Sequence, residues 1–322
     1  MTDHDTIPNL RIVWDVGRLS EWASLLAECG QSSLTQSFGY HQAMLTVEGW
    51  RPRLGIIELS DKPIGLVVMS ERRLLRVVRI ARLHRGPLLR PEARKPSVFA
   101  MVMKLIRQDY PSGPLNWTAV VPEWTAGEEA VSMMRWAGFR RDKAPGYRTL
   151  WLDLRRPEAD LRSGLAQKWR NALNQAERTG LTVEIDRDGK QQLTWLLEQY
   201  QKDKAEKRYR GPSAKLVIRM RTGMYKDGDI LLLRANKDGV PVAGILVLGH
   251  GRAATYQIGW SDAVGRSARA HNLLLWQAML ELKRQGRDWF DLGGILPDTA
   301  PGVTAFKRGM GGVEVELAGA FR

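Results

Sequence analysis

Secondary-structure signals follow the same order in the two halves of the chain, and this recurrence restricts the possible folds more than any other feature. Each half has two β-rich runs joined by a short polar turn, over residues 54–69 and residues 230–248, which is typical of a β-hairpin. Each half then has a helical segment that leads into a further strand, at 115–121 and at 289–292. The repeated order indicates an internal duplication of one α/β unit.

The length of the chain agrees with two such units. Its 322 residues fit two domains of roughly 150 residues each, and we place the boundary so that the domains cover 1–150 and 151–312. Strands that alternate with helices predict a mixed α/β sheet in each half. Apolar residues at helical spacing predict helices at 19–29, 40–47, 96–110, 128–137, 161–178, from 193 onwards, and at 271–285.

Basic residues exceed acidic residues by a wide margin. The chain has 49 lysines and arginines against 35 aspartates and glutamates, which gives a formal net charge of +14. This excess favours a polyanionic partner such as nucleic acid, anionic lipid or a phosphate-bearing substrate, although a solvated basic surface has the same composition. Seven arginines gather between residues 72 and 90, and five of them recur at every third position from Arg73 to Arg85. The stripe is interpreted either as a phosphate- or lipid-facing surface or as a solvated face.

Composition excludes several classes of protein. The single cysteine, Cys29, rules out an intrachain disulfide. The five histidines show no paired spacing, so we expect no structural zinc site. No apolar run approaches the roughly 20 residues of a membrane-spanning helix, and residues 1–9 lack the apolar segment of a signal peptide. We therefore expect a cytoplasmic protein whose contact with a membrane, if any, is peripheral and at the inner face.

The stretch with the clearest chemical potential lies near the C-terminus. Residues 287–295 predict a strand that ends at the pair Gly293 and Gly294, which can adopt the positive φ of a tight turn. Residues 302–312 predict a glycine-flanked loop in which Lys307 follows Phe306. A lysine in such a loop suits the stabilisation of charge on a reacting carbonyl, and it equally suits an ordinary surface turn.

A second stretch invites comparison with a pyrophosphate-binding turn. Residues 265–270 precede a long helix, and coenzyme-A-dependent N-acetyltransferases typically carry a glycine-rich turn at this place. Here Arg269 occupies the position of the middle glycine. This difference weakens the prediction of a coenzyme A site.

Taken together, the motifs resemble those of the FemABX-like family of aminoacyl-tRNA-dependent peptidyltransferases. The resemblance extends over nearly the whole chain, and its most specific part is the strand at 290–295 followed by Phe306 and Lys307. The weaker matches are residues 35–40, 85–87, 152–154, 168–177 and Tyr256.

The resemblance implies a fold and a reaction. It implies two tandem GNAT-like N-acyltransferase domains of the α/β (α+β) class, each a mixed twisted sheet flanked by helices, with a C-terminal strand at 313–322 that completes the first domain. It also implies an aminoacyl-tRNA donor, an amine acceptor on a peptide or cell-wall precursor, and no further cofactor. In this reaction Lys307 would stabilise the oxyanion, with Phe306 and Tyr256 beside it. The substrate-binding residues that the resemblance implies are Gln36, Tyr40, Arg170, Lys207, Arg208, Asp291, Gly293 and Gly294.

The sequence differs from the family at the acceptor site. Family members that use nucleotide-linked precursors look to carry a lysine on the helix after the motif at 35–40. This chain has Gln42 and Met44 at those positions. Lys207 and Arg208 keep a basic cluster, and we expect them to bind acceptor phosphate. Two alternatives stay open: an acyl-coenzyme-A-dependent N-acyltransferase with the same fold, and a basic adaptor that binds RNA or an anionic membrane without catalysis.

Overall fold

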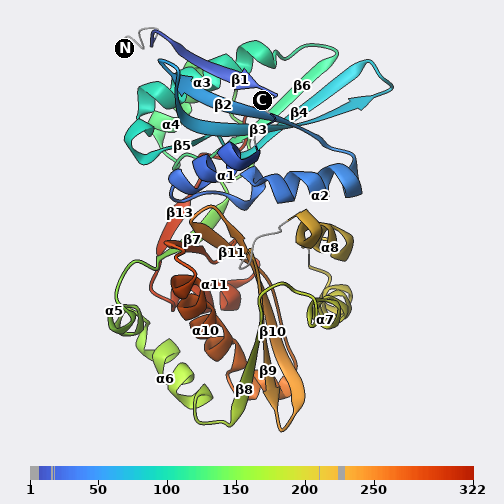
Figure 1. Ribbon diagram of the computed structural model, residues 1–322, viewed down its shortest axis with the longest axis vertical. Coiled ribbons are helices and arrows are strands. Elements are labelled where there is room, and N and C mark those ends of the chain that lie inside the picture. Colours follow the sequence, from blue (N-terminus) through green and yellow to red (C-terminus); the bar gives the residue numbers. More distant parts are fainter. Residues whose placement is uncertain (1–6, 16, 18, 210, 224–228) are drawn as a thin grey trace. The chain divides into compact units, whose positions relative to one another are not determined.

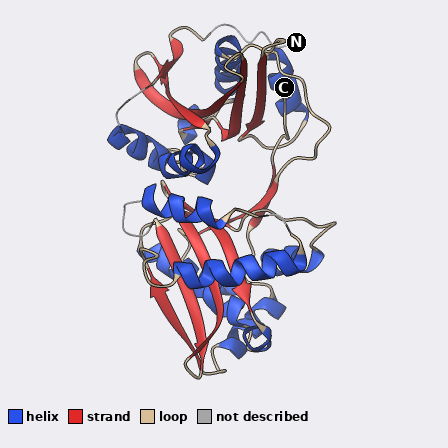
Figure 2. Cartoon of the chain, turned by 90° about the vertical axis from the view of Figure 1, so that its right-hand side faces the viewer, coloured by secondary structure: helices blue, strands red, loops and turns tan. Residues whose placement is uncertain are grey.

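The computed structural model describes residues 7–15, 17, 19–209, 211–223 and 229–322. Most of the N-terminal segment considered for a signal peptide, residues 1–6, lies outside this part. The chain divides into two compact units, one of Met1–Arg148 with Val315–Arg322 and one of Thr149–Glu314. Figure 1 follows the chain through the elements of both units, and Figure 2 shows helices packed against the strands of each sheet.

The first unit contains a six-stranded mixed sheet with the strand order β1-β2-β3-β4-β6, in which β5 pairs with β3. Strands β1 to β4 form an antiparallel meander, and β6 joins β4 in parallel after a helical crossover. The elements are β1 (Leu10–Trp14), α1 (Leu19–Glu28), η1 (Leu34–Gln36), α2 (Phe38–Glu48), β2 (Arg51–Leu59), β3 (Lys62–Leu74), β4 (Val78–Gly86), β5 (Leu88–Leu89), η2 (Pro91–Ala93), α3 (Pro96–Asp109), β6 (Asn116–Pro122) and α4 (Glu128–Trp136).

The second unit contains a seven-stranded sheet with the order β13-β7-β12-β11-β10-β9-β8. Strands β8 to β11 repeat the antiparallel meander, and β12 joins β11 in parallel. The elements are β7 (Arg148–Asp153), α5 (Glu158–Ser163), α6 (Gln167–Ala176), β8 (Leu181–Asp186), α7 (Leu193–Lys207), α8 (Ala214–Gly223), β9 (Ile230–Lys237), β10 (Val240–His250), β11 (Ala253–Ser261), α9 (Ala263–Ser267), α10 (Ala270–Arg284), β12 (Trp289–Asp291), α11 (Pro301–Arg308) and β13 (Val313–Glu316).

The two sheets share one topology, which confirms the predicted duplication. Strands β1, β2, β3, β4 and β6 correspond in order and direction to β8, β9, β10, β11 and β12. The long helices α3 and α10 occupy equivalent crossovers before β6 and β12. A repeated βαβ connection of this kind explains why the hairpin and strand signals recur along the sequence.

Helices cover both faces of the first sheet. Because side chains alternate along a strand, Val67 and Met69 of β3 enter the core under α3 and α4, whereas Leu66 and Val68 enter a second core under α1. The continuous apolar run at this place in the sequence therefore marks a strand buried on both sides. In the second unit one core joins β9 and β10 to α5, α6 and α10. The opposite face meets α7, since a Cβ on Gly244 of β10 would lie 2.7 Å from Trp195.

Two local predictions need correction. The helix expected over 161–178 is broken into α5 and α6. The backbone of Gly311 lies against the break, so closely that a Cβ on Gly311 would be 2.2 Å from Gly164 O. The strand expected over 313–322 covers only Val313–Glu316, and it pairs with β7 in the second sheet. The residues after it join the first unit through the bridges of Leu317 with Thr125 and of Phe321 with Val120.

The arginine stripe at 72–90 has a definite structure that its period did not reveal. It follows the end of β3, the turn and β4, so successive arginines alternate between the faces of the sheet. Arg79 lies over the ring of Tyr110 at 4.3 Å, and Arg82 lies over Trp50 at 4.1 Å. Arg85 is buried and forms two hydrogen bonds of 2.9 Å with Glu123. Part of the stripe therefore stabilises the fold, and the rest is exposed.

Candidate active site

Lys307 is a buried lysine on a helix, where the sequence predicted a loop. Helix α11 begins at Pro301, whose fixed φ suits the first helical position, and it ends at Arg308. Lys307 is only 8% exposed, and its Nζ donates a hydrogen bond of 2.7 Å to the carbonyl of Gly294. The helix thus aims the lysine at the turn that follows β12.

The turn after β12 is held by a buried carboxylate. Asp291 ends the strand fully buried, and its Oδ1 accepts a hydrogen bond of 2.8 Å from the backbone N–H of Gly293. Thr149 on β7 donates to the same oxygen and lies 3.1 Å from Gly293 O. Gly293 has φ +71°, and a Cβ there would lie 3.0 Å from Tyr256 O and 3.8 Å from Lys307 Nζ. Only glycine suits both the backbone conformation and this close approach.

Burial changes the proton affinity of Lys307. Removal of the ammonium from water lowers the pKa of Lys307 to about 8, and the negative charge of Asp291 opposes this shift. The lysine therefore stays mainly protonated at neutral pH. A cation held in a poorly hydrated place interacts more strongly with a developing negative charge than it would in water.

Aromatic side chains form the wall beside the lysine. The Lys307 ammonium lies 5.7 Å from the ring centre of Tyr256, within the range of a cation–π contact. Phe306 packs between Trp169, at 5.9 Å, and His271, at 6.5 Å. Burial lowers the pKa of His271 to about 4, with a smaller contribution from Arg266, so this imidazole is neutral at physiological pH. The wall is thus apolar and uncharged.

Gly259 of β11 makes room for two of these rings. A Cβ at this position would lie 1.8 Å from Tyr256 Oη and 2.8 Å from His271 Nε2. A glycine inside a strand often marks such a close approach. Four of these residues, Thr149, Trp169, His271 and Gly259, were not predicted as site residues from the sequence, in which the glycine within a strand was the one available signal.

Comparisons with known proteins bear on the fold. Residues 161–308 match the family model of an acetyltransferase (GNAT) domain. The crystal structure of FemX is similar over 96% of each chain, with a TM-score of 0.78 and 15% identity. The chain has a FemX-like tandem GNAT fold. This finding confirms the fold that the resemblance of the motifs implied.

Two further solved structures share the FemX-like fold with lower scores. A tandem GNAT protein from the clavulanic acid biosynthesis pathway matches over 97% of each chain, with a TM-score of 0.52 and 14% identity. The C-terminal domain of a putative lysylphosphatidylglycerol synthetase from Agrobacterium fabrum matches over 94% of this chain and 91% of that one, with a TM-score of 0.53 and 13% identity. No curated protein matches the chain. At these identities the likeness concerns the fold.

Within the FemX-like fold, the second unit brings six of the predicted residues together. The Lys307 ammonium contacts the ring of Tyr256, and the neighbouring Phe306 packs against Trp169. The turn to which Lys307 is hydrogen-bonded is formed by Asp291, Gly293 and Gly294. Because Asp291 is fully buried and bonded to Gly293 and Thr149, it supports the turn and does not face a substrate directly. This cluster of residues is the candidate active site.

The basic end of α7 carries the two residues that the sequence predicted for phosphate binding. Lys207 is exposed and pairs with Asp203 at 2.5 Å, and Arg208 caps the helix in the left-handed region with φ 53°. The next residue, Tyr209, has a raised pKa, caused first by burial, then by Asp203, with a smaller contribution from Tyr256. Lys207 and Arg208 stay predictions for phosphate binding.

Arg170 has a structural contact within the second unit. Its guanidinium donates to the carbonyl of Ser163 at 3.1 Å and lies 3.5 Å from that of Leu165. These carbonyls belong to the break between α5 and α6. Arg170 therefore satisfies backbone groups at the break, and no contact with the Lys307 cluster is found in the described part of the chain.

Gln36 and Tyr40 belong to the first unit. Gln36 is fully buried: its Oε1 accepts from Val68 N at 2.8 Å, and its Nε2 donates to His84 O at 3.0 Å. Because this amide joins β3 to β4, it is not available to a substrate in this conformation. Tyr40 is half-buried, and burial raises its pKa to about 12. Its backbone N–H caps α2 by donating to Ser37 Oγ.

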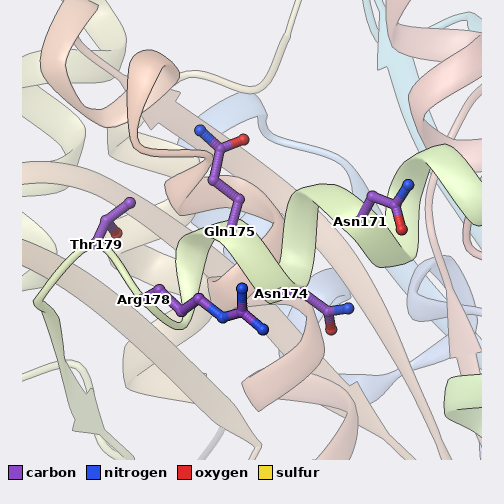
Figure 3. Close-up of a pocket in the computed structure, with 5 residues that line it drawn as sticks. All are labelled: Asn171, Asn174, Gln175, Arg178 and Thr179. Carbon is purple, nitrogen blue, oxygen red and sulfur yellow. The ribbon is translucent and has the colours of Figure 1, made fainter.

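One shallow pocket lies apart from the candidate active site. It has a volume of about 410 Å³ and is lined by polar side chains of α6 and the residues just after it (Figure 3). None of the predicted site residues lines it. Among the described residues no group of three histidine, cysteine or carboxylate side chains is placed to hold a metal ion. The lining residues of the pocket are Asn171, Asn174, Gln175, Arg178 and Thr179.

Proposed function

We propose that the protein is an aminoacyltransferase, which forms an amide bond between an aminoacyl group carried by tRNA and an amine of a peptide or cell-wall-precursor acceptor. The observation that carries the proposal is the buried Lys307 ammonium, which donates to Gly294 O. No other hydrogen bond of this ammonium is found among the described residues. Two of its three N–H groups are therefore available to the oxygen of a ligand.

The reaction follows from the charge that develops on an ester carbonyl. The acceptor amine attacks the carbonyl carbon of the aminoacyl ester, and the carbonyl oxygen becomes an oxyanion. Lys307 stabilises this oxyanion by hydrogen bonds and charge. The C–O ester bond then breaks, and the proton lost by the amine passes to the departing ribose oxygen. Because the departing ribose oxygen takes up the proton of the amine, no separate general base from the protein is required, and Lys307 stays protonated throughout.

Charge and fold support an aminoacyl donor on tRNA. A net charge of +14 suits a polyanionic substrate, and binding through 6 to 10 phosphates would weaken by roughly 10³ to 10⁵ between 50 and 200 mM salt. One protein with a similar fold is named a putative lysylphosphatidylglycerol synthetase, and another is FemX. These names support an aminoacyl group as the unit transferred.

An acyl-coenzyme A donor is the second candidate, and one observation favours it. Arg269 precedes α10 with φ 58°, a conformation that glycine adopts most readily, which supports the comparison of this turn with a pyrophosphate-binding turn although the residue differs. The family model matched by residues 161–308 also describes an acetyltransferase domain. Calorimetric titration with acetyl- and longer-chain acyl-coenzyme A tests this donor, and micromolar binding would support it.

The decisive experiment offers both substrates at once. The protein is incubated with a total aminoacyl-tRNA pool and a set of amine-bearing peptides and precursors, and the acceptors are analysed by mass spectrometry. The proposal predicts a mass increase of one aminoacyl residue that requires intact Lys307. Transfer from acyl-coenzyme A alone, with no product from the tRNA pool, would reject the proposed donor.

A further inference from the structure

The tip of the β3–β4 hairpin exposes apolar side chains to an unusual degree. Leu75 is 91% exposed and Val77 is 64% exposed, and Leu74 beside them is 43% exposed. Leu115 and Trp117, at the start of β6, are 52% and 45% exposed. Figure 1 shows this hairpin extending beyond the neighbouring strands of the first sheet. A contiguous exposed apolar surface of this kind marks an interaction site.

The register of the sheet places these side chains in rows on one face. Leu74 pairs with Val78, and Ile80, two residues further along β4, lies beside Trp117 of β6. Paired residues on adjacent strands point to the same face, as do residues two apart on one strand. Leu74, Val78, Ile80 and Trp117 therefore form a continuous apolar strip that leads to the tip, where Leu75 and Val77 project.

Arginines without acidic partners surround the strip. Arg72, Arg73 and Arg76 are exposed, and none of them forms an ion pair with a described residue. The nearby acid, Glu71, is occupied by Arg79 at 3.0 Å and by the hydroxyl of Tyr110 at 2.6 Å. The tip thus combines an apolar centre with uncompensated positive charge.

The two residues of the β3–β4 turn adopt a backbone conformation that leucine and arginine rarely take. Leu75 and Arg76 have φ values of 49° and 61°, the region in which hairpin turns favour Asn-Gly. The equivalent hairpin of the second unit, between β10 and β11, has Gly251 at φ +54° in its turn, and its Arg252 pairs with Asp288. The turn of that second hairpin, at Gly251 and Arg252, contains no large apolar side chain. An exposed leucine at the tip of this hairpin is therefore particular to the first unit and is not explained by folding.

We propose that the tip of the β3–β4 hairpin docks on the surface of an anionic lipid bilayer. Leu75 and Val77 enter the boundary between head groups and acyl chains, and Trp117 lies at the interface, where amphipathic rings are enriched. Arg72, Arg73 and Arg76 contact lipid phosphates. No helix of the described residues is long and apolar enough to cross a membrane, so the contact is peripheral. The inference goes beyond the proposed function and is independent of the aminoacyl donor.

Lipid suits this surface better than RNA. An RNA backbone would neutralise the arginines, but it would leave the aliphatic tip in water, because single-stranded nucleic acid is held by charge together with aromatic stacking. A bilayer interface satisfies both the charge and the apolar surface. The tip has two aliphatic residues at its centre and a single aromatic residue, Trp117, on its flank.

Co-sedimentation of the full chain with vesicles tests the proposal. Vesicles of phosphatidylcholine alone are compared with vesicles of equal parts phosphatidylcholine and phosphatidylglycerol, and we expect binding to the second kind only. Replacement of Arg72, Arg73 and Arg76 by serine should weaken that binding by about 100-fold. Leu75→Asn should weaken it by about tenfold, although asparagine suits the turn and should not impair folding.

Two matched controls separate the tip from general charge and from catalysis. Replacement of the exposed Arg135, Arg140 and Arg141 by serine removes the same charge elsewhere in the first unit and should have little effect. Lys307→Ala should bind vesicles like the unchanged protein, whatever its transfer activity. The proposal is wrong if the unchanged chain ignores anionic vesicles, or if both arginine triples weaken binding equally. It is also wrong if the tip variants lose affinity for tRNA and keep their affinity for vesicles.

Discussion

Thr149 and Asp291 are 142 positions apart in the sequence and share a hydrogen bond in the interior of the second unit. The Thr149 hydroxyl on β7 donates to the Asp291 carboxylate on β12, which also accepts from Gly293 N. The pair holds the turn whose next residue, Gly294, accepts a hydrogen bond from Lys307. The position of the lysine therefore depends on a strand far away in the sequence.

Thr149→Val should disturb the site without changing the shape of the side chain. Because the substitution leaves a buried carboxylate with one partner fewer, we expect a loss of about 1–3 kcal/mol in the free energy of unfolding and a lower transfer rate. Denaturant unfolding and single-turnover transfer measure the two effects. Thr149→Ser retains the hydroxyl, so its free energy of unfolding and its transfer rate should match those of the unchanged protein. If serine lowers both as much as valine does, the methyl group and not the hydrogen bond is what matters.

Lys307→Met should abolish transfer and stabilise the fold. Burial lowers the lysine pKa from 10.5 to about 8, which corresponds to about 3 kcal/mol of unfavourable charge burial, against about 1 kcal/mol for the lost hydrogen bond. At pH 7 the variant should therefore be more stable by about 2 kcal/mol. The penalty is complete below pH 8 and disappears as pH rises to 10.5. The advantage of the variant should therefore shrink over that range and reverse by about 1 kcal/mol, the contribution of the hydrogen bond, once the penalty is gone.

Denaturant unfolding of both proteins between pH 7 and pH 10.5 provides the measurement. A constant difference in the free energy of unfolding over this range would contradict the lowered pKa of Lys307. Full transfer activity in Lys307→Met would remove the lysine from the mechanism altogether.

The rate of transfer should fall as pH rises through about 8, because stabilisation of the oxyanion requires protonated Lys307. Initial rates should be recorded, since the donor ester hydrolyses in alkaline solution. Lys307→Arg serves as the comparison, because a guanidinium keeps its proton over the whole range. Any residual transfer rate of this variant should not fall at alkaline pH. If it falls as in the unchanged protein, the group that titrates near pH 8 is not Lys307.

Gly259→Ala should displace Tyr256 and His271 from the wall of the site, since its Cβ would lie 1.8 Å from the tyrosine Oη. We expect a lower transfer rate together with a loss of stability of about 1–3 kcal/mol. Gly302→Ala on α11 is the control, because no atom lies within 4 Å of the position that its methyl group would take. That change should be neutral or stabilising by about 0.5–1 kcal/mol. Wild-type kinetics in Gly259→Ala would indicate that the wall has no role.

Gln36→Leu should affect stability and not substrate binding. The change leaves Val68 N–H without its acceptor in a buried place, while His84 O keeps its hydrogen bond from the Thr35 hydroxyl at 2.6 Å, so the free energy of unfolding should fall by about 1–3 kcal/mol. Gln42→Leu on α2, where the half-buried side chain forms no hydrogen bond with a described residue, should change it by less than about 1 kcal/mol. A raised KM in the folded Gln36→Leu protein would restore the residue to the substrate site.

The order of elements could be predicted from the sequence because it rests on local periodicity. Two β-rich apolar runs joined by a short polar turn, at 54–69 and again at 230–248, specify hairpins, and the apolar spacing of 96–110 and 271–285 specifies the crossover helices. Together they determined the duplicated α/β architecture. The choice of Lys307 also came from the sequence, through the motif around it and not through any single residue.

Only the tertiary structure decided how the site is built. It placed Lys307 on a helix, lowered its pKa by burial, and brought Thr149 and His271 to the same cluster. It also showed that Gln36 joins two strands. These properties depend on contacts between residues far apart in the chain, and burial and hydrogen-bond partners at such separations leave no periodic signal in a single sequence.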